Sequence, residues 1–150
     1  MRLFISLLFS LIVTTHVFAG DSIIIRPSWQ MDKCAAHTPY GVPKSARLDM
    51  TPICRQGYAL EYDNKAKIPA WVAYTLTPGN AVGCSPRAST FRMDPSIESV
   101  SSARSKDYAK SGYDIGHMAN SGDMRWSSQA EAESNLLSNA APQLPGLNRA

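Results

Sequence analysis

The sequence has no apolar segment long enough to cross a membrane, no internal repeat and no low-complexity tract. The apolar run Leu3–Val13 is well short of the roughly 20 residues that a membrane-spanning helix needs, which argues against a permanent anchor. Arg2 precedes this run, and the small-residue ending Val17-Phe18-Ala19 follows it. This order is typical of a cleaved signal peptide, so we expect residues 1–19 to be removed and the protein to be secreted or periplasmic.

Cleavage after Ala19 leaves 131 residues, which suits a single domain at 20–150.

A strong net charge is also absent. Loss of Arg2 leaves 14 of the 15 basic residues against 12 acidic ones, a net charge of +2. A polyanion could therefore be recognised only through local cations and not through the overall field. The candidate cations are Arg87, Arg92, Arg125 and Arg149.

Cysteine is scarce, with only Cys34, Cys54 and Cys84. Export to an oxidising compartment favours one disulfide and one remaining thiol. We favour Cys34 with Cys54, although the sequence alone does not fix the pairing; this bridge closes a loop of about 20 residues and stabilises by about 3 kcal/mol. The spacing Cys34-x-x-His37 is compatible with zinc, but no second close pair of ligands follows it.

Histidine is scarce too: of three, His16 lies in the signal segment, which leaves His37 and His117 as candidate bases. A neutral imidazole can take a proton from water near pH 7. We favour His117, because Gly116 lets the backbone approach a ligand closely and Asp114 supplies a carboxylate that can organise the turn. We interpret His37 as structural.

Residues 57–62 and 70–76 are rich in aromatic and branched side chains and predict two antiparallel strands. Residues 78–112 lack periodicity and are expected to be mostly loop, with the serine-rich segment 96–105 at the surface. Four aromatic side chains could stack nucleic-acid bases, but at strand spacing they are better explained as core. They are Tyr58, Tyr62, Trp71 and Tyr74.

A helix is expected at 128–138. Ser128 and Glu131 have the spacing of a capping box, which marks the start of the helix. Pro142 requires the helix to end before it. On this helix we expect Glu131 and Glu133 to face solvent, so neither is a favoured catalytic acid.

Carboxamides gather near the C-terminal end of the sequence. The neutral, hard oxygen of Asn148 suits Mg²⁺, although an asparagine after glycine and leucine also fits a turn or a helix N-cap. Asn139 and Gln143, taken singly, are better explained as backbone hydrogen-bonding groups. Together with His117, however, this cluster suggests metal-assisted cleavage of a phosphodiester.

Three segments carry a family resemblance: Tyr113–Ala119 (YDIGHMA), Ser138–Gln143 (SNAAPQ) and Leu147–Arg149 (LNR). Together they resemble the DNA/RNA non-specific endonuclease family, which has the ββα-metal core of the His-Me finger superfamily. The similarity extends back through 91–95, 71–74 and 54–58, so it covers most of the mature chain.

The resemblance implies an α+β fold in which an antiparallel sheet carries the ββα-metal finger. It implies that His117 is the general base, that Asn148 binds Mg²⁺ directly, with Mn²⁺ or Ca²⁺ as alternatives, and that Asn139 is a supporting catalytic asparagine. Arg87, upstream of Phe91, is the candidate for contact with a substrate phosphate.

The sequence departs from the family pattern at three places. Ile115 stands where the family usually has arginine, and removal of one preorganised donor of this kind costs about a hundredfold in rate. Asn120 replaces the usual proline. The tryptophan and glutamate that the family places after Asn148 are absent before the sequence ends at Ala150, so we expect the helical part of the motif to be incomplete and the domain partial.

Two functions follow from these observations. The first is a secreted, Mg²⁺-dependent endonuclease that hydrolyses DNA and RNA without strong sequence preference. The alternative is a catalytically weak or inactive relative that binds nucleic acid, as Ile115 and the missing glutamate suggest. Cleavage in the presence of a divalent ion distinguishes the two.

Overall fold

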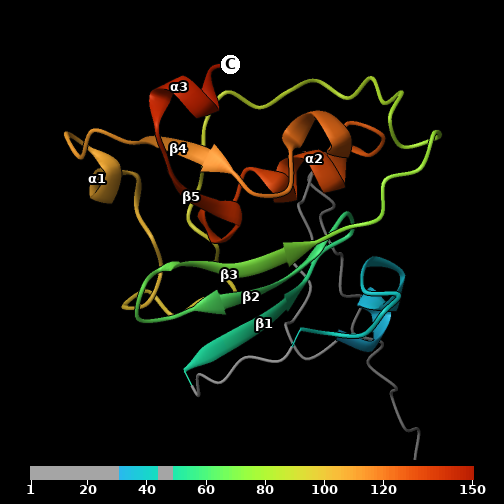
Figure 1. The fold of residues 1–150 in the computed structure, drawn as a ribbon, viewed down its shortest axis with the longest axis horizontal. Helices are drawn as coiled ribbons and strands as arrows, with labels where there is room; N and C mark the ends of the chain where they lie inside the picture. Colours follow the sequence, from blue (N-terminus) through green and yellow to red (C-terminus); the bar gives the residue numbers. More distant parts are fainter. Residues whose placement is uncertain (1–30, 44–48) are drawn as a thin grey trace, which may run out of the picture.

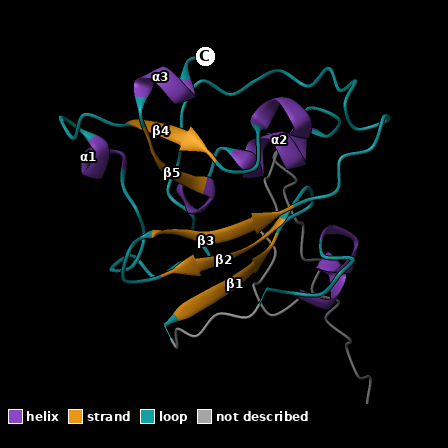
Figure 2. Cartoon of the chain, in the orientation of Figure 1, coloured by secondary structure: helices purple, strands orange, loops and turns teal. Residues whose placement is uncertain are grey.

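The computed structural model describes residues 31–43 and 49–150, and in it two antiparallel sheets lie side by side (Figures 1 and 2). The larger sheet has the order β1-β2-β3, formed by Met50–Cys54, Ala59–Asp63 and Ile68–Ala73. The smaller sheet pairs β4, Asp114–His117, with β5, Ala140–Gln143. The fold is α+β, as expected.

The predicted signal peptide, residues 1–19, and the predicted start of the domain at residue 20 lie outside the described residues. Among the residues that are described, no helix combines the length and the apolar character that a membrane span requires.

The two predicted strands are confirmed as β2 and β3, which pair antiparallel with Leu60 opposite Val72. The sequence did not indicate β1, because Pro52 interrupts it. Proline cannot donate to a neighbouring strand, and among the described residues β1 is accordingly an edge strand whose one partner is β2. The short strands β4 and β5 were also missed, since four residues are too few to establish an alternating pattern.

The aromatic residues of the larger sheet form core, as expected. Tyr58 and Tyr62 are fully buried, Tyr74 packs against the same apolar cluster, and Trp71 packs against the cluster around Cys34. The hydroxyl of Tyr58 donates to the carbonyl of Glu133 (2.7 Å), so its burial leaves no unpaired polar group.

The helices are short. They are α1 (Ser105–Tyr108), α2 (Ser128–Ser134), α3 (Pro145–Asn148) and the 3-10 segments Met31–His37, Ser121–Met124 and Leu137–Asn139. Most of 78–112 is loop, but α1 lies within it. The serine-rich segment is not simply a surface loop, because Ile97, Ser102 and Ala103 are buried.

The predicted helix at 128–138 exists but ends at Ser134, because Ser134 and Asn135 turn their side chains back onto the carbonyl of Glu131 (2.7 and 2.9 Å). Such bonds compete with continuation of a helix. The capping box was wrong: the N-cap is Ser127, whose hydroxyl accepts from the amide of Ala130. The expected exposure of Glu131 was also wrong, since it is 4% exposed.

Glu133, likewise expected at the surface, is fully buried. Its carboxylate accepts from the backbone amide of Gln56 (2.7 Å) and from the side chain of Gln129 (2.7 Å). It therefore joins α2 to the turn between β1 and β2 and has a structural role.

The disulfide joins Cys34 to Cys54, the pairing favoured from the sequence, with the two Cα atoms 5.7 Å apart. Because Cys34 is bonded in this way, it does not offer a thiolate to a metal at the Cys34-x-x-His37 spacing. Nε2 of His37 lies 3.1 Å from the carbonyl of Gln56, a structural contact. Cys84 is a free, exposed thiol.

Candidate active site

His117 is the last residue of β4 and pairs with Ala140, the first residue of β5. Gln143 donates from Nε2 to the carbonyl of His117 (3.1 Å) and so fixes the backbone there. A Cβ atom on Gly116 would lie 2.1 Å from the side chain of Gln143. Gly116 therefore makes room for Gln143, a different role from the close approach to a ligand that the sequence suggested.

The ring of His117 is held on two sides. It lies against Phe91, with ring centroids 4.4 Å apart, and its Nε2 lies 3.1 Å from Oδ1 of Asn135. Burial lowers the pKa of His117 below the ordinary 6.5, and the positive charge of Arg87 adds to the lowering. The hydrogen bond to Asn135 and the charge of Glu131 oppose it. The imidazole is therefore neutral at pH 7.

The bond to Asn135 also selects the tautomer. Nδ2 of Asn135 donates to the carbonyl and to the carboxylate of Glu131 (2.9 and 3.0 Å), so the amide oxygen is the atom that faces His117. An amide oxygen only accepts, which means that Nε2 carries the proton. Nδ1 is left with the lone pair and is the nitrogen that can act as a base.

Asn135 is a site residue that the sequence analysis missed. It was placed inside the predicted helix and was given no role. One signal was available: Glu131 and Asn135 are four residues apart, which puts them on the same face of a helix. Glu131 in turn accepts from the backbone amide of Ala88 (2.7 Å), so one buried carboxylate orients both Asn135 and the loop beside the site.

Asn148 lies on the helical turn α3, which follows β5 and packs near β4 (Figure 1). Its Nδ2 donates to Oδ2 of Asp114 (3.2 Å), and Arg149 grips the same carboxylate with two bonds (2.7 and 2.6 Å). Hydrogen bonds from Arg149 and Asn148 lower the pKa of Asp114. Asp114 thus organises its surroundings, as expected, by fastening α3 to β4.

One cavity of about 430 Å³ brings three of the predicted site residues together. Its lining includes His117 from β4, Asn148 from α3 and Arg87 from the loop before Phe91. Asn135 and Ile115 line it as well. Ile115, which takes the place of the family's arginine, packs at the same time against the apolar cluster that contains Leu137 and Ala140.

Asn139 does not line this cavity. It is fully buried, its Nδ2 donates to the carbonyls of Ala119 and Ser134 (2.9 and 2.8 Å), and its Oδ1 accepts from the amide of Ala119 (2.8 Å). These bonds tie the chain just after His117 to the end of α2. The polar atoms of Asn139 are thus engaged in holding the backbone behind the site.

The donors around this cavity fit a hard divalent cation. The side-chain nitrogen of Asn148 donates to Asp114, which orients the amide group. No described residue donates to the amide oxygen of Asn148. Mg²⁺ commonly takes one or two protein oxygens and keeps several waters, so a single amide oxygen is a sufficient ligand. Within residues 31–43 and 49–150, no three His, Cys, Asp or Glu side chains gather as zinc sites require.

Known proteins resemble this chain in sequence. Human mitochondrial Endonuclease G is 38% identical over 111 residues, covering 73% of this chain and 36% of the relative. Zebrafish mitochondrial nuclease EXOG is 42% identical over 87 residues (57% and 25%), and a nuclease of Syncephalastrum racemosum is 39% identical over 99 residues (63% and 31%). The chain thus spans about a quarter to a third of the length of these relatives.

The fold has a solved counterpart in the crystal structure of the EndoG/EndoGI complex. The TM-score is 0.69 and the identity 34%, covering 77% of this chain and 47% of the matched chain. This match covers a ββα-metal nuclease fold, and in this chain β4, β5 and α3 follow one another in that order along the sequence, with α2 between the two strands. The family profile described as DNA/RNA non-specific endonuclease matches residues 36–150, and this chain belongs to that family.

Proposed function

We propose that the protein is a divalent-metal-dependent nuclease that hydrolyses phosphodiester bonds of DNA and RNA without strong sequence preference. The observation that carries the proposal is the single cavity lined by His117, Asn148 and Arg87. It combines a neutral imidazole, an amide oxygen suited to a cation and a guanidinium suited to a phosphate.

His117 is the general base in this proposal. Its Nδ1 takes a proton from a water molecule, whose oxygen forms the new bond to phosphorus while the bond to the leaving oxygen breaks. The leaving oxygen takes its proton from solvent. Asn135 holds Nε2–H in place and so keeps Nδ1 directed at the water. Positioned bases of this kind contribute about 10² to 10⁴ in rate.

Asn148 is the proposed metal ligand, and Mg²⁺ is the proposed ion, with Mn²⁺ or Ca²⁺ as alternatives. When bound, Mg²⁺ supplies the positive charge that stabilises the phosphoryl oxygens in the transition state. Arg87 binds a substrate phosphate at the same cavity. Asn139 supports the site through its three backbone hydrogen bonds.

Residues 1–19 are proposed to be a signal peptide and 20–150 the nuclease domain, so that the protein acts outside the cytoplasm. The order of charge, apolar run and small residues at the N-terminal end supports export, and the Cys34–Cys54 disulfide suits an oxidising compartment. N-terminal sequencing of protein recovered from the periplasm or medium checks this, and a chain that still begins at Met1 contradicts it.

Cleavage of plasmid DNA and of RNA by the purified chain tests the proposed activity, with Mg²⁺ and with a chelator. We expect Mg²⁺-dependent cutting by the wild-type chain. In His117→Ala, the rate of cutting should fall by about a hundredfold or more. His37→Gln is the matched control, because His37 bonds Gln56 and lines no part of the cavity. Undiminished cutting by His117→Ala contradicts the proposal.

Ile115 favours the alternative, a weak or inactive nucleic-acid-binding relative, because it places an apolar side chain in the cavity where the family usually has arginine. Salt-sensitive binding without cleavage under Mg²⁺, Mn²⁺ or Ca²⁺ is the result expected of that alternative. Measurable turnover excludes an inactive relative.

A further inference from the structure

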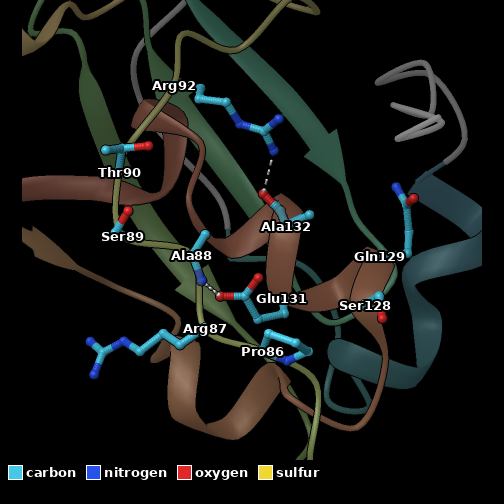
Figure 3. Close-up of a pocket in the computed structure, with 10 residues that line it drawn as sticks. All are labelled: Pro86, Arg87, Ala88, Ser89, Thr90, Arg92, Ser128, Gln129, Glu131 and Ala132. Atoms are coloured by element: carbon cyan, nitrogen blue, oxygen red, sulfur yellow. Dashed lines mark hydrogen bonds between the residues drawn. The ribbon is translucent and has the colours of Figure 1, made fainter. Parts of the chain in front are cut away.

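A second hollow, of about 790 Å³, adjoins the cavity of His117 along the loop segment 86–90. Residues 87–90 line both hollows, so this segment forms the rim between them. The far side of the second hollow is formed by α2, through Ser128, Gln129 and Ala132 among others (Figure 3).

Hydrogen bonds hold this rim in place. The backbone amide of Ser85 donates to the carbonyl of Arg125 (3.0 Å), and Nε of Arg125 donates back to the carbonyl of Ser85 (2.8 Å). In the middle, the amide of Ala88 donates to the carboxylate of Glu131 (2.7 Å), as Figure 3 shows. A rim fixed in this way costs little entropy to order when a ligand binds.

Two exposed guanidinium groups lie at the hollows: Arg87, on the rim, lines both, and Arg92, two residues beyond the rim, lines the second. Arg87 and Arg92 are both exposed, and in Figure 3 their side chains extend from the chain in different directions. Arg87 lines the same cavity as His117. Nη2 of Arg92 donates to the carbonyl of Ala132 (3.4 Å), which keeps this guanidinium over the second hollow.

Glu131 also lines the second hollow, but its negative charge does not face the guanidinium groups of Arg87 and Arg92. Glu131 is 4% exposed, and its Oε1 already accepts from Ala88 and Asn135. Its carboxylate is thus directed inward at protein donors. The hydroxyls of Ser89 and Thr90, which line the hollow, are further groups able to donate to a phosphate oxygen.

We propose that the second hollow is a subsite for the nucleic acid strand, in which Arg92 binds a backbone phosphate beyond the one at the His117 cavity. The inference rests on the proposed function in taking a nucleic acid as the occupant. A strand that crosses the rim meets Arg87 and then Arg92, and contacts to phosphates alone carry no base preference.

Binding measurements in the His117→Ala background, with chelator present, test the subsite without cleavage. Fluorescence anisotropy follows a labelled dinucleotide and a single strand of about eight nucleotides over a range of salt concentrations. The variants are Arg92→Ala and Arg92→Lys. Lys65→Ala is the matched control, because it removes one exposed positive charge from the β2–β3 turn.

We expect Arg92→Ala to weaken binding of the longer strand about fivefold or more and to reduce the slope of log affinity against log salt by about 0.7, the value for one phosphate of a single strand. Arg92→Lys keeps most of the slope because it keeps the charge. Dinucleotide binding is unchanged in both variants, and Lys65→Ala changes neither ligand. The subsite is overturned if Arg92→Ala binds the longer strand with the same affinity as the Lys65→Ala control. It is also overturned if Arg92→Ala loses affinity equally for the dinucleotide and the longer strand.

The two proposals fail separately. If the wild-type chain cleaves nucleic acid and Arg92→Ala binds normally, the subsite is wrong and the nuclease proposal stands. If the wild-type chain does not cleave but Arg92→Ala loses affinity for the longer strand only, the subsite stands and the nuclease proposal is wrong. Absence of any strand binding overturns the subsite.

Discussion

Oδ1 of Asn135 lies 3.1 Å from Nε2 of His117, and this contact decides which imidazole nitrogen is basic. The amide of Asn135 is itself fixed by Glu131, so the orientation of His117 depends on two buried side chains, one on α2 and one at its C-cap. His117 is thus prepared for proton transfer before any substrate binds.

Asn135→Ala should lower kcat by about tenfold to a hundredfold, because a base misplaced by about 1 Å loses rate on that scale. It should also lower the pKa of His117 further, since the hydrogen bond that His117 donates to Asn135 raises it. NMR titration of the His117 ring and steady-state cleavage measure the two effects. Asn80→Ala, at a turn where Asn80 bonds Thr77, is the control. An unchanged ring pKa together with an unchanged kcat contradicts the assigned contact.

The pH dependence of kcat/KM should follow the neutral form of His117. Because burial and Arg87 lower its pKa, activity should be lost as the pH falls through a midpoint below 6.5. Arg87→Ala removes one lowering influence, so its midpoint should move to higher pH. A pH–rate profile of both proteins, with Lys65→Ala as control, checks the shift; a midpoint above 6.5 in the wild-type protein speaks against His117 as the base.

Ile115→Arg should increase the cleavage rate by about tenfold or more, because it returns a guanidinium to the cavity where phosphate charge develops. Ile115→Met keeps the volume without the charge and should leave the rate unchanged. Because Ile115 packs against a buried cluster, thermal unfolding of both variants must accompany the kinetics. A folded Ile115→Arg protein with no gain in rate indicates that another cation already fills this role.

Removal of the disulfide in a Cys34→Ala/Cys54→Ala double variant should lower the free energy of unfolding by about 3 kcal/mol, the chain-entropy value for a loop of this length. Urea denaturation measures the difference. Cys84→Ala should have little effect, since that thiol is free and exposed. Equal stability of the double variant and the wild-type protein would show that the bridge constrains the unfolded chain little.

The sequence predicted what depends on local chemistry and missed what depends on tertiary contacts. His117 and Asn148 could be selected because few residue types suit a base and a hard cation, and both line the cavity. Asn135 could not, since its partner His117 is 18 residues away in the sequence and meets it only in the folded chain. Glu131 looked like a capping residue from its spacing, but the N-cap is Ser127, one residue earlier than the expected Ser128, and the carboxylate of Glu131 turns inward to Ala88.

The same distinction holds for the fold. The aromatic segments that became β2 and β3 showed strand composition, whereas β4 and β5 have four residues each and include Gly116 and Pro142, which strands disfavour. Their pairing is set by long-range contacts, such as that of Gln143 with the backbone of His117. The motif singled out Asn139, but the sequence could not show that its amide bonds the backbone of Ala119 and Ser134.

The central claim is that His117 and Asn148 act on the same phosphodiester, one through the base and the other through the cation. Plasmid cleavage measured against Mg²⁺ concentration tests it most directly. We predict that Asn148→Ala raises the Mg²⁺ concentration for half-maximal rate by about tenfold or more, as loss of one of very few protein ligands should. His117→Ala should reduce the maximal rate about a hundredfold with that concentration unchanged. An Asn148→Ala protein with wild-type dependence on Mg²⁺ would contradict the claim.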